Sequence, residues 1–168
     1  SQAMRVDAGS AVDFAGHDQT LGALFVAEGA SLAGGSSADR SQLSVEGPAE
    51  IRSDNSALYA DWTLGASDVT LTEEAALGHG TTTLTGTRLA IAGAGASGEF
   101  TSAIAGDRTS GITVSDHADV AFGTGALAGF EGAFAVAQNA SARVNVEEDA
   151  VIENLLTVEE TGTLALAS

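Results

Sequence analysis

The sequence lacks cysteine and contains very little proline, lysine or arginine. Its 168 residues include no Cys, one Pro and six Lys plus Arg, against 23 Asp plus Glu. Without Cys there are no disulfides and no thiolate chemistry. A formal net charge of −17 excludes the basic patches that nucleic acids and anionic membrane surfaces require. We therefore expect neither as a partner.

Long apolar runs are also missing. No run reaches the ~18 residues of a membrane-spanning helix, and no signal peptide is visible. Hydrophobic residues nevertheless make up 44% of the chain, which an acidic disordered segment would not contain. We interpret residues 1–3 (Ser-Gln-Ala) as a cloning scar and residues 4–168 as an ordered fragment of a longer protein. The apolar end, 164–168, resembles an open coil rather than a cap.

A nine-residue pattern recurs along the chain: apolar, any, apolar, three of any type, small, any, apolar. Copies begin at positions 4, 24, 43, 69, 89, 112, 134 and 156, so the intervals are similar but not equal. One additional copy begins at Val144 and passes through Ala150 to Ile152. Regular self-similarity of this kind is the signature of a solenoid.

The first three positions of each copy alternate as in a β-strand, with two side chains inward and one outward. The first inward column is Met4, Leu24, Leu43, Val69, Leu89, Ile112, Phe134 and Leu156. The second is Val6, Val26, Val45, Leu71, Ile91, Val114, Val136 and Val158. A slip of one residue would expose both columns, so the pattern specifies the register.

The remaining positions predict a corner followed by a second strand. We expect an all-β parallel β-helix of about eight coils, each of ~22 residues with two or three short strands, stacked at about 4.8 Å. An antiparallel sandwich is the competing architecture, but its strands would not repeat one strand-turn-strand motif. The longest interval, from Leu43 to Val69, predicts an insertion or bulged loop at residues 53–63, which holds the single Tyr and the single Trp, Tyr59 and Trp62. Trp62 is expected as a lid over the coil, or else as an exposed contact.

Several runs resemble passenger domains of bacterial autotransporters, of the antigen 43 and AIDA adhesin type with passenger-associated repeats. They are residues 19–26 (Gln-Thr-Leu-Gly-Ala-Leu-Phe-Val), 81–86 (Thr-Thr-Thr-Leu-Thr-Gly) and 154–158 (Asn-Leu-Leu-Thr-Val). The resemblance implies a right-handed β-helix displayed outside the cell. It also implies a parent protein anchored in the outer membrane by a C-terminal barrel that lies outside this sequence.

The sequence offers no catalytic, cofactor-binding or metal-binding constellation. His17, His79 and His117 are isolated and are expected to be exposed loop residues. Gly-x-Ser-x-Gly, phosphate-loop and dinucleotide motifs are missing, and the glycine-rich stretch 93–98 lacks the context of a Rossmann turn. We therefore predict no enzyme activity, no cofactor and no metal.

Acidic residues recur in the predicted corner and should stack into a negative stripe. They are Asp7, Glu28, Glu46, Glu73 or Glu74, Asp116, and Glu159 or Glu160. Such a stripe favours solubility and opposes edge-to-edge aggregation. The alternatives are weak bridging by divalent cations and binding of a basic partner.

The regular scaffold favours a structural and adhesive module involved in virulence, which binds host surface or matrix molecules or self-associates between passengers. The alternative is a β-helix carbohydrate-active enzyme, a lyase or hydrolase. Such sites cluster Asp, Arg or Lys over consecutive coils, and the six Lys plus Arg do not recur at one position. An ice-binding helix is a third hypothesis, suggested by Thr81-Thr82-Thr83 and Thr85-Gly86-Thr87, although the other coils lack such Thr-x-Thr rows.

Overall fold

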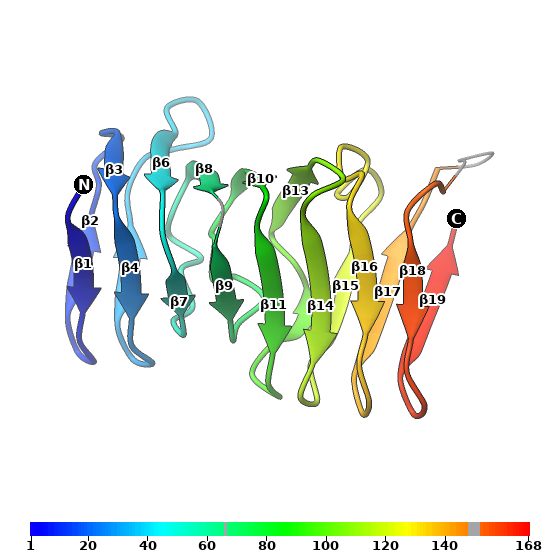
Figure 1. Ribbon diagram of the computed structural model, residues 1–168. Coiled ribbons are helices and arrows are strands. Elements are labelled where there is room, and N and C mark those ends of the chain that lie inside the picture. Colours follow the sequence, from blue (N-terminus) through cyan, green and yellow to red (C-terminus); the bar gives the residue numbers. More distant parts are fainter. Residues whose placement is uncertain (66, 148–151) are drawn as a thin grey trace.

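A computed structural model describes residues 1–65, 67–147 and 152–168. These residues form a stack of parallel β-coils (Figure 1). They form no α-helix, and therefore none long and apolar enough to cross a membrane. The predicted solenoid is confirmed.

The longest sheet, called the front sheet, contains one strand from every coil. Its strands in spatial order are β1 (Ala3–Val6), β4 (Ala23–Val26), β7 (Ala49–Ile51), β9 (Asp68–Leu71), β11 (Arg88–Ala92), β14 (Gly111–Ser115), β16 (Ala133–Val136) and β18 (Leu156–Val158). All neighbours pair in parallel. Eight strands are separated by about seven turns of ~22 residues, close to the predicted eight coils.

Two further sides complete the coil. The upper sheet has the spatial order β3 (Gln19–Leu21), β6 (Ser41–Val45), β8 (Ala60–Gly65), β10 (Gly80–Thr85) and β13 (Ser102–Gly106). The rear side holds two sheets, β2 (Ala11–Asp13) with β5 (Ser31–Ala33), and β12 (Ser97–Glu99), β15 (Asp119–Phe122), β17 (Ser141–Asn145) and β19 (Thr163–Ala167).

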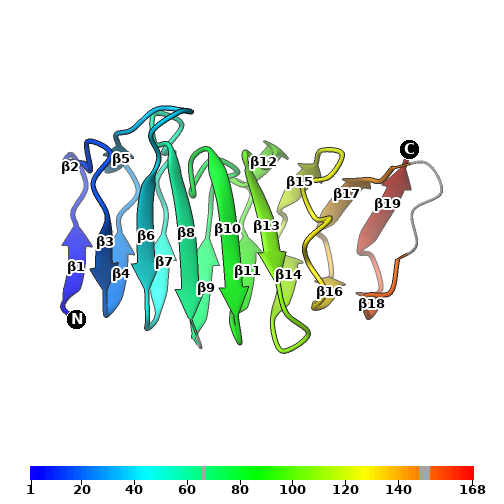
Figure 2. The ribbon, with the colours of Figure 1, turned by 90° about the horizontal axis from the view of Figure 1, so that it is seen from above.

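The coils wind in a right-handed sense. In Figure 1 the front strands run downward, the rear strands run upward, and the chain advances from left to right. Figure 2, seen from above, shows the upper strands crossing toward the front sheet between these two passages. This winding agrees with the strong preference of parallel crossover connections for one hand.

The third copy of the repeat begins in the upper sheet and not, as the pattern predicts, in the front sheet. Leu43 and Val45 lie in β6 of the upper sheet, where they pair with Trp62 and Leu64 of β8. The front-sheet positions of this coil are taken by Ala49 and Ile51, beside Leu24 and Val26 of β4 and Val69 and Leu71 of β9. The nine-residue pattern matched here because it fits any two apolar strands joined by a short corner.

The insertion also lies at another place than predicted. Along the front sheet, the stretch of chain from Leu24 to its partner Ala49 is longer than the stretch from Ala49 to Val69. The extra residues form a turn at 34–40, where Ser36 and Asp39 form an antiparallel bridge. The predicted insertion at 53–63 instead contains the start of β8, which pairs with both β6 and β10. Residues 53–63 are therefore a regular part of the third coil and not an insertion.

The core is the interior of the stack. Side chains from all three sides fill it, and Leu24, Leu32, Ile51 and Leu71 are fully buried. Trp62 is 1% exposed and its indole N–H donates to the Leu77 carbonyl at 2.9 Å. It is therefore a core residue of β8, neither the predicted lid nor an exposed contact.

The corner between the front and rear sides is a tight turn that repeats along the stack. In several coils the amide of its fourth residue donates to the carbonyl of its first, as Ala30 does to Ala27 at 3.1 Å. The third residue then has positive φ, at Gly29 (83°), Asn139 (60°) and Thr161 (69°). This conformation is that of a type II turn, for which Gly and Asn are suited. The buried small residue that follows, such as Ala30 or Ala140, confirms the predicted corner.

The corner between the upper and front sides brings backbones close together. A Cβ on Gly47 would lie 2.1 Å from the Gly22 carbonyl oxygen of the preceding coil. Further along, Thr87 Oγ1 donates to the Leu64 carbonyl at 2.6 Å and Asn154 Nδ2 donates to the Gly132 carbonyl at 2.7 Å. At this corner the close approach is therefore met either by a glycine or by a side chain that donates a hydrogen bond to a carbonyl of the preceding coil.

Candidate functional site

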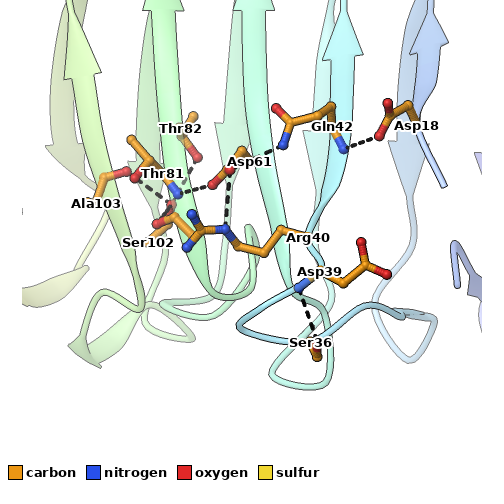
Figure 3. A network of polar contacts seen from close by, with 11 residues as sticks. Asp18, Ser36, Asp39, Arg40, Gln42, Asp61, Thr81, Thr82, Ser102 and Ala103 are labelled. Carbon is orange, nitrogen blue, oxygen red and sulfur yellow. Dashed lines mark hydrogen bonds and ion pairs between the residues drawn. The ribbon is translucent and has the colours of Figure 1, made fainter. Parts of the chain in front are cut away.

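A polar network crosses the upper sheet over four consecutive coils (Figure 3). Asp61 of β8 is at its centre: Oδ1 accepts the backbone N–H of Thr81 at 2.9 Å, and Oδ2 accepts Nε2 of Gln42 at 3.3 Å. Gln42 in turn donates its backbone N–H to Oδ1 of Asp18 at 2.9 Å. The network links Asp18 of the first coil to Thr81 of the fourth.

The turn at 34–40 contributes the cation of this network. Arg40 Nε lies 3.2 Å from Asp61 Oδ2, and the two side chains are 42% and 25% exposed. The turn closes internally where the Asp39 amide donates to Ser36 Oγ at 3.1 Å. An ion pair exposed to this degree contributes at most about 1 kcal/mol. Its role is to orient the Arg40 side chain over the sheet.

Outward hydroxyls form a column beside the network. Thr20, Ser44, Thr63 and Thr83 occupy one register position of β3, β6, β8 and β10. Three of them are exposed and Ser44 is half-buried. Successive positions of the column lie on neighbouring strands, which are about 4.8 Å apart. Ala105 of β13 ends the column.

The hydroxyl column was not predicted from the sequence, where Thr81–Thr83 looked like an isolated run. Its members are unequally spaced along the chain, so no fixed period reveals them. A local signal exists, because each hydroxyl residue directly precedes an inward apolar residue: Leu21, Val45, Leu64 or Leu84. The column becomes apparent only from the pairing of β3, β6, β8 and β10 in the upper sheet.

Hydroxyls also occur on the buried side of this sheet. Thr82 Oγ1 and Ser102 Oγ are 3.0 Å apart, and Ser102 Oγ also donates to the Gly80 carbonyl at 3.2 Å. Ser41 of β6 is fully buried, and its Oγ has no hydrogen-bond partner among the described residues. Thr82 and Ser102 thus link neighbouring coils by hydrogen bonds on the buried side of the sheet.

The acidic corner is present with one predicted member misplaced, because Asp7, Asp116 and Glu159 follow front strands β1, β14 and β18 as predicted. Glu28, Asp54, Glu73 and Glu74 follow front strands β4, β7 and β9 and interact electrostatically. Glu46 follows β6 and lies at the other corner, where it accepts Ser1 Oγ at 2.9 Å. The coil of β11, which follows that of β9, is neutral in its front-to-rear corner, where residues 93–96 are Gly and Ala. The acidic stripe is therefore interrupted after the fourth coil.

Within this corner, Glu73 has a raised pKa. Partial burial raises its pKa above the ordinary value of 4.5, and the charges of Glu74, Asp54 and Glu28 raise it further. The folded protein therefore holds a proton on Glu73 more tightly than the unfolded chain does. Ionised Glu73 disfavours the folded state at neutral pH, and this penalty disappears as pH falls through the folded pKa.

We expect Glu73→Gln to raise the thermal midpoint at pH 7. The repulsion between such exposed charges is below about 1 kcal/mol, which limits the increase to about 2–4 °C. The gain should vanish in acid, where Glu73 is neutral in both proteins. Thermal melts at several pH values, with Glu99→Gln as a control that removes the same charge elsewhere, measure it. An equal gain from the control variant, or one that persists in acid, would contradict this account.

The three histidines lie far apart. His17 and His117 are exposed, as predicted, and His117 has a positive φ of 68° in its turn. His79 is half-buried, stacks on Tyr59 with ring centroids 4.9 Å apart, and places Nε2 2.9 Å from the Ser56 carbonyl. Tyr59 and His79 thus form a packing pair at the edge of the upper sheet, a contact that the sequence did not reveal.

No group of three or more His, Asp or Glu side chains within residues 1–65, 67–147 and 152–168 is arranged to hold a metal ion. The predicted copy beginning at Val144 includes Ala150, which lies outside the described residues. A hollow of about 390 Å³ occurs near the last coils, lined by Phe130, Phe134, Leu156 and Leu166 among others. Charged residues, among them Arg108, Glu131 and Glu147, also line it, so its surface is partly apolar and partly charged.

No family model matches this chain, and neither the curated proteins nor the solved structures include one that matches it.

Proposed function

We propose that this chain is a structural and adhesive segment of a surface-displayed passenger, and that the upper sheet is its contact face. The observation that carries the proposal is the hydroxyl column of Thr20, Ser44, Thr63 and Thr83 on a parallel sheet. A regular column of donors and acceptors is suited to an extended partner that repeats along the same axis. Display at the bacterial surface, from an anchored parent protein, follows from the resemblance to autotransporter passengers.

The polar network supports this choice of face. Gln42 and Arg40 both contact Asp61, so less side-chain entropy remains to be lost when a partner binds. The front sheet differs, because its outward positions hold Arg, Phe, Glu, Thr and Ala in no continuous column. Host surface or matrix molecules, or passengers on another cell, are the proposed partners.

The test compares two pairs of threonines. Thr63→Arg with Thr83→Arg alters the upper sheet, whereas Thr70→Arg with Thr113→Arg makes the same change in charge on the front sheet. Each chain is displayed on bacterial cells, and settling and binding to immobilised matrix proteins are measured. We expect the wild-type chain to adhere, the first variant to lose at least tenfold in binding, and the second to retain it.

Mixing displaying and non-displaying cells separates the two kinds of partner, since self-association draws only displaying cells into aggregates. Wild-type cells that stay dispersed and bind no matrix protein would refute the adhesive function. Equal loss in both variants would refute the upper sheet as its contact face.

A further inference from the structure

The outward side of β6, β8 and β10 is polar along its whole length. Its side chains are exposed or half-buried, and all except Gly65 carry a hydrogen-bonding group: Gln42, Ser44, Asp61, Thr63, Thr81, Thr83 and Thr85. The cores of protein–protein interfaces are instead enriched in aromatic residues and Met and depleted of Asp and Ser. This face is therefore suited to a partner that is itself covered with hydrogen-bonding groups.

Charge restricts the class of partner further. The formal net charge of −17 repels anionic chains, including sulfated and carboxylated polysaccharides. On the face itself Asp61 and Arg40 are paired, with Arg40 Nε 3.2 Å from Asp61 Oδ2. An uncharged partner is not repelled by the molecule as a whole and binds without breaking this pair.

The face holds its donors and acceptors in a defined arrangement. Asp61 accepts the Thr81 backbone N–H and Gln42 Nε2, and these bonds orient the Gln42 amide. Arg40 approaches Asp61 through Nε, so its two terminal amino groups remain as donors for a ligand (Figure 3). The exposed hydroxyls of the neighbouring column can both donate and accept. A polyhydroxylated ligand, whose own groups also do both, matches this set.

The spacing of the strands favours a linear chain of sugar rings. β6, β8 and β10 pair in parallel without a break, so equivalent outward positions lie on strands about 4.8 Å apart. An extended glycan presents one ring after another at a comparable interval, with hydroxyls along its edges. A glycan laid across the strands therefore meets the same register position on each of them.

We propose that this face binds a neutral, linear glycan laid across β6, β8 and β10, with Thr63, Thr83 and Arg40 among its hydrogen-bonding contacts. The inference rests on the proposed adhesive function and names the chemical class of its partner. Each contact replaces a hydrogen bond to water, so a single site binds weakly, with a Kd of about 1 mM. Many copies displayed on one cell raise the avidity for a polymeric glycan.

The test is a ligand-observed NMR titration of the purified chain with three neutral hexasaccharides: cellohexaose, chitohexaose and mannohexaose. A heparin hexasaccharide is the anionic comparison. We expect at least one neutral hexasaccharide to bind with the same Kd in low and high salt, because salt screens charges and not these hydrogen bonds. The heparin hexasaccharide should not bind.

Threonine-to-valine variants locate the site. Thr63→Val with Thr83→Val removes two hydroxyls but keeps branched side chains suited to a strand, and should weaken binding about tenfold. Thr70→Val with Thr113→Val makes the same change at outward positions of the front sheet and should leave the Kd unchanged. Circular dichroism and Trp62 emission verify that each variant is folded. Failure of all three neutral hexasaccharides to bind, equal loss in both variants, or binding of the heparin hexasaccharide alone would overturn the inference.

The assay on displaying cells separates this inference from the proposed adhesion. Cells that adhere, although the purified chain binds none of the neutral hexasaccharides, would overturn the glycan as partner and leave the adhesive function in place. Cells that do not adhere, although the purified chain binds a hexasaccharide through Thr63 and Thr83, would refute adhesion and support the glycan-binding face.

Discussion

Replacing Asn55 with alanine is expected to destabilise the fold by about 2–5 kcal/mol. Asn55 is 1% exposed and joins three coils. Its Oδ1 accepts the Leu32 amide of the second coil and the Ser53 hydroxyl of its own, both at 2.8 Å. Its Nδ2 donates to the Ala76 carbonyl of the fourth coil at 2.7 Å. Alanine would remove all three bonds and leave a buried amide and carbonyl without this partner.

The aspartate variant isolates the Nδ2 bond. In Asn55→Asp the ionised side chain still accepts from Leu32 and Ser53 but repels the Ala76 carbonyl, and burial of its charge is costly. Protonation would restore a donor and neutralise the carboxyl, so its folded pKa should exceed its unfolded pKa. Its stability should therefore approach that of the wild type as pH falls, whereas the deficit of Asn55→Ala should not respond in this way.

Urea unfolding followed by Trp62 emission measures both variants. Gln138→Ala is the control, because it removes an exposed amide side chain from a corner turn and should change stability by less than about 0.5 kcal/mol. If Asn55→Ala unfolds at the same urea concentration as the control, the three bonds do not hold the coils together.

Replacing Trp62 with alanine should have a similarly large effect, about 3–5 kcal/mol. Trp62 is among the largest fully buried side chains, and its neighbours in the upper sheet are Leu43 and Thr82. Removing the indole leaves a large cavity at the middle of the stack. It also removes the hydrogen bond to the Leu77 carbonyl.

Trp62→Phe separates packing from hydrogen bonding. Phenylalanine fills much of the space but provides no N–H, so we expect a loss of about 1–3 kcal/mol from the unsatisfied Leu77 carbonyl. Circular dichroism must follow unfolding, since neither variant contains tryptophan. Thr63→Ala, at the exposed neighbouring position of β8, should be nearly neutral. A Trp62→Ala variant as stable as Thr63→Ala would place the indole outside the core.

Much of the architecture could be predicted from side-chain type alone. Alternating apolar residues such as Leu24 and Val26, each pair followed by a tight corner and a small residue, specify a strand that must turn and stack. Every front strand except one was located correctly for this reason. The exception, β7, contains Ala49 and Ile51, and the stronger apolar pair Leu43 and Val45 precedes it.

The candidate site could not be predicted in the same way. The interval from Leu43 to Val69 is the longest between copies of the repeat, so the sequence predicts an insertion at residues 53–63. In the fold Asn55 is buried, since its amide satisfies backbone groups of two other coils. Composition cannot distinguish an exposed Asn from one whose partners lie in the coils before and after it.

The sequence by itself determined that a parallel β-solenoid is favoured, because one strand-turn-strand motif recurs along the chain and the strands of an antiparallel sandwich would not repeat it. It also determined the acidic character of the front corner. Only the tertiary structure decided which strands share a sheet. The coils differ in the length of their corners, so the alignment of Thr20, Ser44, Thr63 and Thr83 depends on backbone pairing between coils rather than on any constant spacing.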